Sequence, residues 1–149
     1  MPYTCTMKVQ HIREVRAFNR YYTRVIGLLD NHYLQSKYSL PEVRVLFELY
    51  HHPDTTPSDI ITELGMDKGY LSRTLQAFVK NKIARKSVSS TDKRSVSLQL
   101  TTKGIKEFEG LNTAAEKQLA ELFVHLTGKE CEKLTSNMKE IQQLLSGKK

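Results

Sequence analysis

The chain has 149 residues, with 23 Lys and Arg against 16 Asp and Glu, so its formal net charge is +7. This length suits a single domain with its own core, and the basic balance suits a polyanionic partner. The two cysteines, Cys5 and Cys131, give no disulfide framework. With no signal peptide and no apolar run long enough for a bilayer, the sequence predicts a soluble cytoplasmic protein and excludes membrane-spanning or disulfide-stapled classes.

The first predicted helix covers residues 9–33 and is long and aromatic for so small a chain. Its apolar side chains recur at helical spacing and form one broad stripe. The members of this stripe are Val9, Ile12, Val15, Phe18, Tyr22, Val25, Ile26 and Leu29.

A second helix is predicted from the capping box Ser39–Glu42 to Tyr50, with Pro41 in its first turn. It should bury Val43, Leu46, Phe47 and Leu49. A short third helix follows from the cap Thr56 through Leu64, with Ile60, Ile61 and Leu64 facing inward.

Gly65 predicts a tight turn with positive φ, and Asp67 predicts the cap of a fourth helix that runs to Asn81. Leu71, Leu75 and Phe78 fall at core spacing on this helix. Two helices joined by a short glycine-containing turn are typical of a helix-turn-helix.

The hydrophobic period then changes to two, which predicts strands at 83–89 and 95–100 joined by a polar turn. Val96, Leu98 and Leu100 should alternate inward on the second strand. Two long helices complete the chain, one from Thr101–Thr102 to Leu126 and one from the capping box Thr127–Glu130 through Leu145. The predicted fold is therefore mainly α with a small β-hairpin wing, a winged helix-turn-helix with long terminal helices.

The basic excess is concentrated in residues 67–103, which hold nine basic and two acidic side chains. The other 112 residues hold 14 of each sign, so their charges cancel. An ordinary solvated surface mixes both signs, so this segment points to a polyanion.

The fourth helix presents polar side chains outside its core positions, and these suit a reader of the DNA major groove. Arginine pairs with guanine and glutamine with adenine, while serine and lysine reach phosphates or base edges. The candidate residues are Lys68, Gly69, Tyr70, Ser72, Arg73 and Gln76. The alternative is a plain exposed polar face.

In the hairpin, Arg85 and Lys86 on the first strand and Lys93 and Arg94 at the tip are candidates for phosphate or minor-groove contacts. Asp92 is the candidate that orients Arg94. The alternative is edge-strand charge that prevents aggregation.

Three segments together resemble the multiple-antibiotic-resistance regulator (MarR) family: Leu64–Arg73 (LGMDKGYLSR), Asp92–Arg94 (DKR) and Leu100–Gly104 (LTTKG). The D-x-R wing followed by L-T-x-x-G is the most specific part, and the resemblance covers nearly the full chain. It implies a homodimer with interlocked first and last helices, a pseudo-palindromic double-stranded operator and, often, release by a small-molecule effector.

Four further segments are similar to the regulator halves of fused MarR–GNAT acetyltransferases: VRAFNRYYTR from Val15, IGLL from Ile26, RVLFE from Arg44 and DKGYLSR from Asp67. Since the chain stops at Lys149, we expect no acetyl-CoA fold and no acetyltransferase activity.

Several sensor hypotheses stay open. Cys5 invites a thiol-based redox role, against an incidental thiol. The five histidines show no compact ligand spacing, so no metal and no cofactor are predicted. Tyr22, Tyr33 and Tyr38 are candidate liners of an effector site, although core and dimer packing is the preferred role.

We therefore expect one MarR-like domain over residues 1–149, with dimerisation helices at 9–36 and 104–149 and a DNA-binding region at 37–103. The expected function is a sequence-specific, homodimeric transcriptional repressor. The alternatives are a non-specific architectural DNA-binding protein, a redox-sensing regulator or a pure dimerisation module. An enzyme is not expected, because no nucleophile–base–acid set or phosphate-cradling loop occurs.

Overall fold

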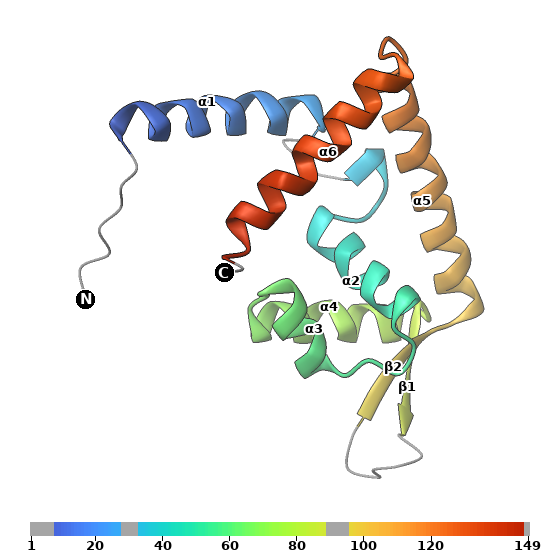
Figure 1. The fold of residues 1–149 in the computed structure, drawn as a ribbon. Coiled ribbons are helices and arrows are strands. Elements are labelled where there is room, and N and C mark those ends of the chain that lie inside the picture. Colours follow the sequence, from blue (N-terminus) through green and yellow to red (C-terminus); the bar gives the residue numbers. More distant parts are fainter. Residues whose placement is uncertain (1–7, 28–32, 89–95, 148–149) are drawn as a thin grey trace, which may run out of the picture. The chain divides into compact units, whose positions relative to one another are not determined.

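A computed structural model describes residues 8–27, 33–88 and 96–147 (Figure 1). Within these ranges the chain is mostly helical with one antiparallel two-stranded hairpin, so the predicted fold class is confirmed. The elements in order are α1 (Val9–Val25), a 3₁₀ turn (Tyr33–Gln35), α2 (Leu40–His51), α3 (Pro57–Leu64), α4 (Lys68–Lys80), β1 (Ala84–Val88), β2 (Val96–Leu100), α5 (Thr102–Leu122) and α6 (Gly128–Leu145).

The chain divides into two compact units, Met1–Leu111 and Asn112–Lys149. The first unit holds a single core between α2, α3, α4, the hairpin and the first turns of α5. Its buried apolar side chains are Tyr38, Val45, Leu46, Leu49, Ile60, Leu71, Leu75, Phe78, Ile83, Ala84, Leu98, Leu100, Phe108 and Leu111. In the second unit, the capping residue Thr127 starts α6 after the end of α5.

The helix starts follow the local signals in the sequence. Ser39 accepts a hydrogen bond from the backbone N–H of Glu42, whose carboxylate accepts one from the N–H of Ser39 at 2.7 Å. The same reciprocal pairing joins Thr127 to Glu130. Each box satisfies backbone donors that a helix terminus leaves without partners, so both predicted capping boxes are confirmed.

The turn between α3 and α4 also agrees with its prediction. Gly65 ends α3 in the left-handed conformation, with φ of 59°. The carboxylate of Asp67 accepts a hydrogen bond from the backbone N–H of Tyr70 at 2.8 Å and so caps α4. This short turn fixes the angle at which α4 leaves α3.

The hairpin pairs Arg85 with Gln99 and Lys86 with Leu98. The backbone N–H of Leu98 also donates to the carbonyl of Thr55, which ties β2 to the loop after α2. One expectation for this strand is wrong: Val96 is 45% exposed, whereas Ser97 is buried. Val96 does share the face of Leu98, and both line the space beside α4, but this end of the strand is not covered. Ser97 lies on the opposite face, where its hydroxyl donates to the backbone carbonyl of Ser87 and lies 3.4 Å from the carboxylate of Asp54.

The hairpin, the end of α4 and the start of α5 meet at the carbonyl oxygen of Ile83. This oxygen accepts hydrogen bonds from the backbone N–H of Thr101 at 2.9 Å and from its hydroxyl at 3.1 Å. A Cβ on Gly104 would lie 2.1 Å from the same oxygen. Only glycine therefore allows α5 to approach the hairpin this closely.

Two other expectations are corrected. The first helix ends at Val25 rather than Tyr33, because the backbone of Gly27 turns to a φ of 70°. Of the predicted dimerisation segment 9–36, this helix therefore covers Val9–Val25. Phe47 is 46% exposed rather than buried, because its ring packs beside those of His51 and Phe108 at the edge of the core.

Helix α1 has no buried residue, and the first half of its predicted stripe is open to solvent in the single chain. Val9, Ile12, Val15 and Phe18 are each 43–65% exposed. On α6, Ile141, Leu144 and Leu145 are exposed as well. None of the helices within residues 8–27, 33–88 and 96–147 combines the length and the apolar character needed to cross a membrane.

Candidate nucleic-acid interface

Helix α4 has one buried side and one open side. Leu71, Thr74, Leu75 and Phe78 are buried against the core, as the spacing predicts for the three apolar positions. The six candidate reading residues lie outside this buried side. Lys68, Gly69, Ser72, Arg73 and Gln76 are exposed, and Tyr70 is half-buried.

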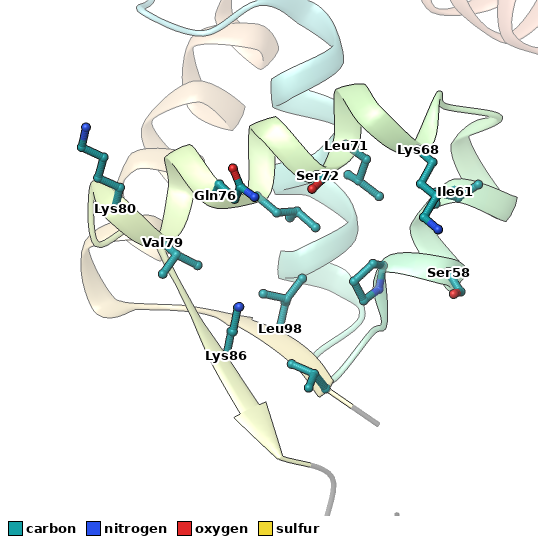
Figure 2. Close-up of a pocket in the computed structure, with 13 residues that line it drawn as sticks. Ser58, Ile61, Lys68, Leu71, Ser72, Gln76, Val79, Lys80, Lys86 and Leu98 are labelled. Atoms are coloured by element: carbon teal, nitrogen blue, oxygen red, sulfur yellow. The ribbon is translucent and has the colours of Figure 1, made fainter. Parts of the chain in front are cut away.

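A hollow of about 570 Å³ separates α4 from the hairpin, and we call it the hairpin-side hollow (Figure 2). Its floor is apolar, and basic or polar side chains surround it. Figure 2 shows Lys68, Ser72 and Gln76 along α4, with Lys86 and Leu98 facing them from the hairpin. The full lining is Pro57, Ser58, Ile61, Lys68, Leu71, Ser72, Leu75, Gln76, Val79, Lys80, Lys86, Val96 and Leu98.

The two basic candidates on β1 serve different faces of the hairpin. Lys86 lines the hollow beside α4. Arg85 instead donates to the side chain of Gln99 at 3.1 Å, and Gln99 donates to the carboxylate of Asp54 at 2.6 Å. Because neighbouring residues of a strand point to opposite faces, one basic residue faces α4 while the other braces the hairpin against the loop after α2.

A second hollow of about 580 Å³ lies on the other side of α4, against the start of α2, and we call it the α2-side hollow. Tyr70 spans it, with its hydroxyl 3.4 Å from that of Ser39. The lining residues are Leu40, Pro41, Arg44, Leu64, Met66, Asp67, Tyr70 and Arg73. Of the predicted reading residues, Tyr70 and Arg73 therefore belong to this side of the helix.

Gly69 lies beside the guanidinium group of Arg73 at the start of α4. A Cβ at Gly69 would meet Nη1 of Arg73 at 3.5 Å and the cap oxygen of Asp67 at 3.2 Å. The arginine thus extends along the open side of α4 toward the helix start, where backbone N–H groups favour anions.

The exposed cations of this surface have no acidic partner within the described part of the chain. The ion pairs found there are Lys37–Glu107, His52–Glu48 and Lys117–Glu121, and none involves the candidate residues. Lys68, Arg73 and Lys86 therefore present uncompensated positive charge on one side of the first unit. The candidate tip residues Asp92, Lys93 and Arg94 lie outside the described residues, as does Cys5.

The candidate effector liners are placed as packing residues. Tyr38 is buried, its ring is edge-on to Phe78, and its hydroxyl donates to Glu107. The ring of Tyr22 stacks on Phe18 at 5.5 Å between centroids, and Tyr33 is half-buried. The preferred packing role describes Tyr38 and Tyr22, and neither lines a hollow described above.

The structure adds two residues that the sequence did not single out: Ser58 lines the hairpin-side hollow, and Arg44 lines the α2-side hollow. Lys80, which follows Gln76 by one helical turn and belongs to the polar side of α4 that the sequence predicts, also lines the hairpin-side hollow. Arg44 lies in another helix, far from the basic segment in sequence, and only the fold brings it beside α4.

Comparison with known proteins gives consistent matches. Residues 37–95 match the model of the MarR family. An uncharacterised helix-turn-helix transcriptional regulator of Bacillus subtilis, YfiV, is 33% identical over 86 residues, which are 57% of this chain and 54% of YfiV. The chain thus spans about half the length of this curated relative.

Solved structures match along nearly the full chain. Wild-type MarR of Escherichia coli in its apo form is 24% identical, with a TM-score of 0.69 over 91% of this chain and 97% of that one. A mutant of the same protein in complex with operator DNA gives a TM-score of 0.66 over 89% and 94%, again at 24% identity. BpsR of Bordetella bronchiseptica, whose DNA binding is regulated by 6-hydroxynicotinic acid, is 18% identical, with a TM-score of 0.67 over 87% and 98%.

At these identities the solved structures establish the fold, and the family model locates the match in the segment that holds α2, α3, α4 and the hairpin. The protein therefore has the winged helix-turn-helix fold of MarR-type transcriptional regulators, with the MarR family match carried by residues 37–95.

Proposed function

We propose that the protein is a homodimeric transcriptional repressor that binds a pseudo-palindromic, double-stranded DNA operator sequence-specifically. The observation that carries this proposal is the open side of α4, where Lys68, Ser72, Arg73 and Gln76 are exposed beside a basic hairpin. These side chains can pair with base edges and phosphates, and no described acid pairs with the cations. MarR of E. coli, which shares the fold, has been solved with operator DNA.

Each subunit would place α4 in one major groove, with the hairpin against the neighbouring strand. The dimer would form through the exposed apolar stripes of α1 and α6, since patches of this kind mark interaction surfaces. This division keeps the expected regions, with dimerisation at 9–36 and 104–149 and DNA binding at 37–103. The similarity to the regulator half of MarR–GNAT fusions stays a prediction, as does the absence of enzymatic activity.

Release by a small apolar or phenolic effector belongs to the same proposal. The hairpin-side hollow has the volume of a small-molecule site and an apolar floor. A ligand there would occupy the surface that the DNA needs. BpsR provides a related case, in which a small aromatic acid regulates DNA binding.

The test is to select bound duplexes from a random pool and then compare the selected site with random DNA at fixed salt. A repressor binds the selected site at least about a thousandfold more tightly than random DNA. Equal affinity for both would favour the architectural alternative. A monomer that ignores every duplex at low ionic strength would refute the proposal. Repeating the binding with candidate metabolites tests release.

A further inference from the structure

The α2-side hollow contains an arginine that the candidate interface does not use. Arg44 projects from α2 into this hollow and shares its lining with Arg73 of α4. Arg44 is exposed, and within the described residues it makes no hydrogen bond or ion pair through its side chain. An arginine head group with no partner among the described residues, placed beside a candidate base-reading arginine, is available to a bound anion.

The other polar groups of the hollow already have partners. The carboxylate of Asp67 accepts the capping hydrogen bond from Tyr70, and the Tyr70 hydroxyl lies 3.4 Å from Ser39. The hollow therefore offers two guanidinium groups against a single carboxylate that is engaged in a helix cap. Its remaining lining is apolar and comes from Leu40, Pro41, Leu64 and Met66.

The position of the hollow tells which anion fits. A helix in a DNA groove lies between two sugar–phosphate strands, so each side of such a helix faces a row of phosphates. On one side of α4 the hairpin provides Lys86. On the other side the described surface provides Arg44, above apolar side chains that suit the C–H faces of deoxyribose.

We propose that the α2-side hollow binds a phosphate of the DNA strand on that flank, with Arg44 as its contact. The proposal rests on the proposed function, since it assigns a further contact to the same complex. It also separates the roles of the two arginines: Arg73 reads a base, whereas Arg44 binds the backbone irrespective of sequence.

The experiment measures the affinity of Arg44→Gln for the selected operator and for random DNA over a series of salt concentrations. Removing one phosphate contact should lower the slope of log affinity against log salt by about 0.9 and weaken both duplexes by the same factor. Lys106→Gln, an exposed cation of α5 that lines neither hollow, is the matched control and should leave the slope unchanged. Arg44→Lys keeps the charge and should keep most of the slope.

A second arm locates the contact on the DNA. Operators with one neutral methylphosphonate linkage at successive positions should bind the wild type less tightly at each contacted phosphate. Arg44→Gln should be insensitive to one of these positions and otherwise follow the wild type. The proposal would be overturned if Arg44→Gln had the affinity and the salt slope of the wild type. It would also be overturned if the variant bound only the operator more weakly and bound random DNA as the wild type does. A wild type that binds no duplex would instead refute the proposed function itself.

Discussion

Burial raises the pKa of the Tyr38 hydroxyl above its ordinary range, and its hydrogen bond to the Glu107 carboxylate raises it further. For Glu107, burial raises the pKa, but hydrogen bonds from Tyr38 and Lys37 outweigh it and leave the pKa below its usual value. The folded state therefore favours a protonated phenol beside an ionised carboxylate. This pair connects the segment before α2 to α5 through side chains alone.

Tyr38→Phe should lower the free energy of unfolding by about 1–3 kcal/mol at pH 7, because it removes a partly buried hydrogen bond to a charged group. The tyrosine contribution is present below the ordinary pKa of about 10 and is lost as the pH rises toward the raised folded-state value. Urea unfolding of the wild type and of Tyr38→Phe at pH 7 and at pH 11 measures the loss in the free energy of unfolding and its dependence on pH. A variant whose deficit persists undiminished at pH 11 would contradict this account.

Arg73→Ala should weaken operator binding by about 1–3 kcal/mol and relax the preference at one base pair. The reason is that a guanidinium group on the open side of α4 can pair with both acceptors of a guanine. The measurement is binding to operators that differ by single base pairs. Uniform weakening on all of them would instead assign Arg73 to a phosphate.

Gly104→Ala should destabilise the protein by about 1–3 kcal/mol, because the added methyl group would collide with the carbonyl of Ile83. Gly110→Ala on the same helix is the matched control, since a Cβ there meets nothing within 4 Å. Alanine should stabilise α5 at that position by up to about 1 kcal/mol. Thermal unfolding of both variants measures the two changes in stability. Equal changes would show that the contact between Gly104 and the carbonyl of Ile83 is not the cause of the destabilisation.

At the scale of the elements, the two faces of the hairpin have different roles. Lys86→Gln should weaken the binding of every duplex by the same factor, since Lys86 faces the hollow beside α4. It should also lower the slope of log affinity against log salt by about 0.9, the value for one lost phosphate contact. Arg85→Gln should leave the salt slope unchanged, because Arg85 is engaged with Gln99 on the opposite face. Salt titrations of both variants provide the comparison, and equal slopes for the two would contradict the assignment.

The helices were predictable because their signals are local. Ser39, Thr127 and Asp67 each form hydrogen bonds within a few residues, so the sequence neighbourhood alone determines the cap. Gly65 likewise meets a requirement of its own turn. The core positions of α4 followed from the helical period.

The errors arose where distant segments decide the outcome. The burial of Ser97 depends on hydrogen bonds to Ser87 and on the loop that contains Asp54, which lies 43 residues away. Alternation places Val96 on the same face as Leu98, where both line the hairpin-side hollow, but it does not predict that Val96 stays 45% exposed. The sequence also grouped Arg85 with Lys86 by charge, although the pleat assigns them to different faces.

The candidate site was predictable as a segment but incomplete as a surface. The basic excess of residues 67–103 correctly marked α4 and the hairpin as neighbours. Arg44 was not found because it belongs to α2, and only the fold brings the start of α2 beside α4. A surface assembled from several helices needs the fold before its members can be named.

At the scale of the whole molecule, the apolar face of α1 is the feature that a single chain leaves unsatisfied. If the proposed dimer forms through this face, Phe18→Glu should leave the protein monomeric, because it places a charge in a stripe whose side chains are about half exposed in the isolated chain. Sedimentation velocity measures the association state, and circular dichroism checks that the helices persist.

The same variant should lose most of its operator affinity, since a monomer can occupy only one half-site. Asn19→Glu is a suitable control on the same helix, because Asn19 is exposed and lies outside the apolar stripe. A dimeric Phe18→Glu variant would place the association surface elsewhere.

The carbonyl oxygen of Ile83 has a mechanical consequence. It receives two hydrogen bonds from Thr101 and lies against Gly104, while the N–H of Ile83 donates to the carbonyl of Phe78 in α4. The end of α4, the base of the hairpin and the first turn of α5 are therefore held together at one residue. Under the proposed function, a tilt of the first turn of α5 would change the distance between the hairpin and α4, and with it the fit of this surface to DNA.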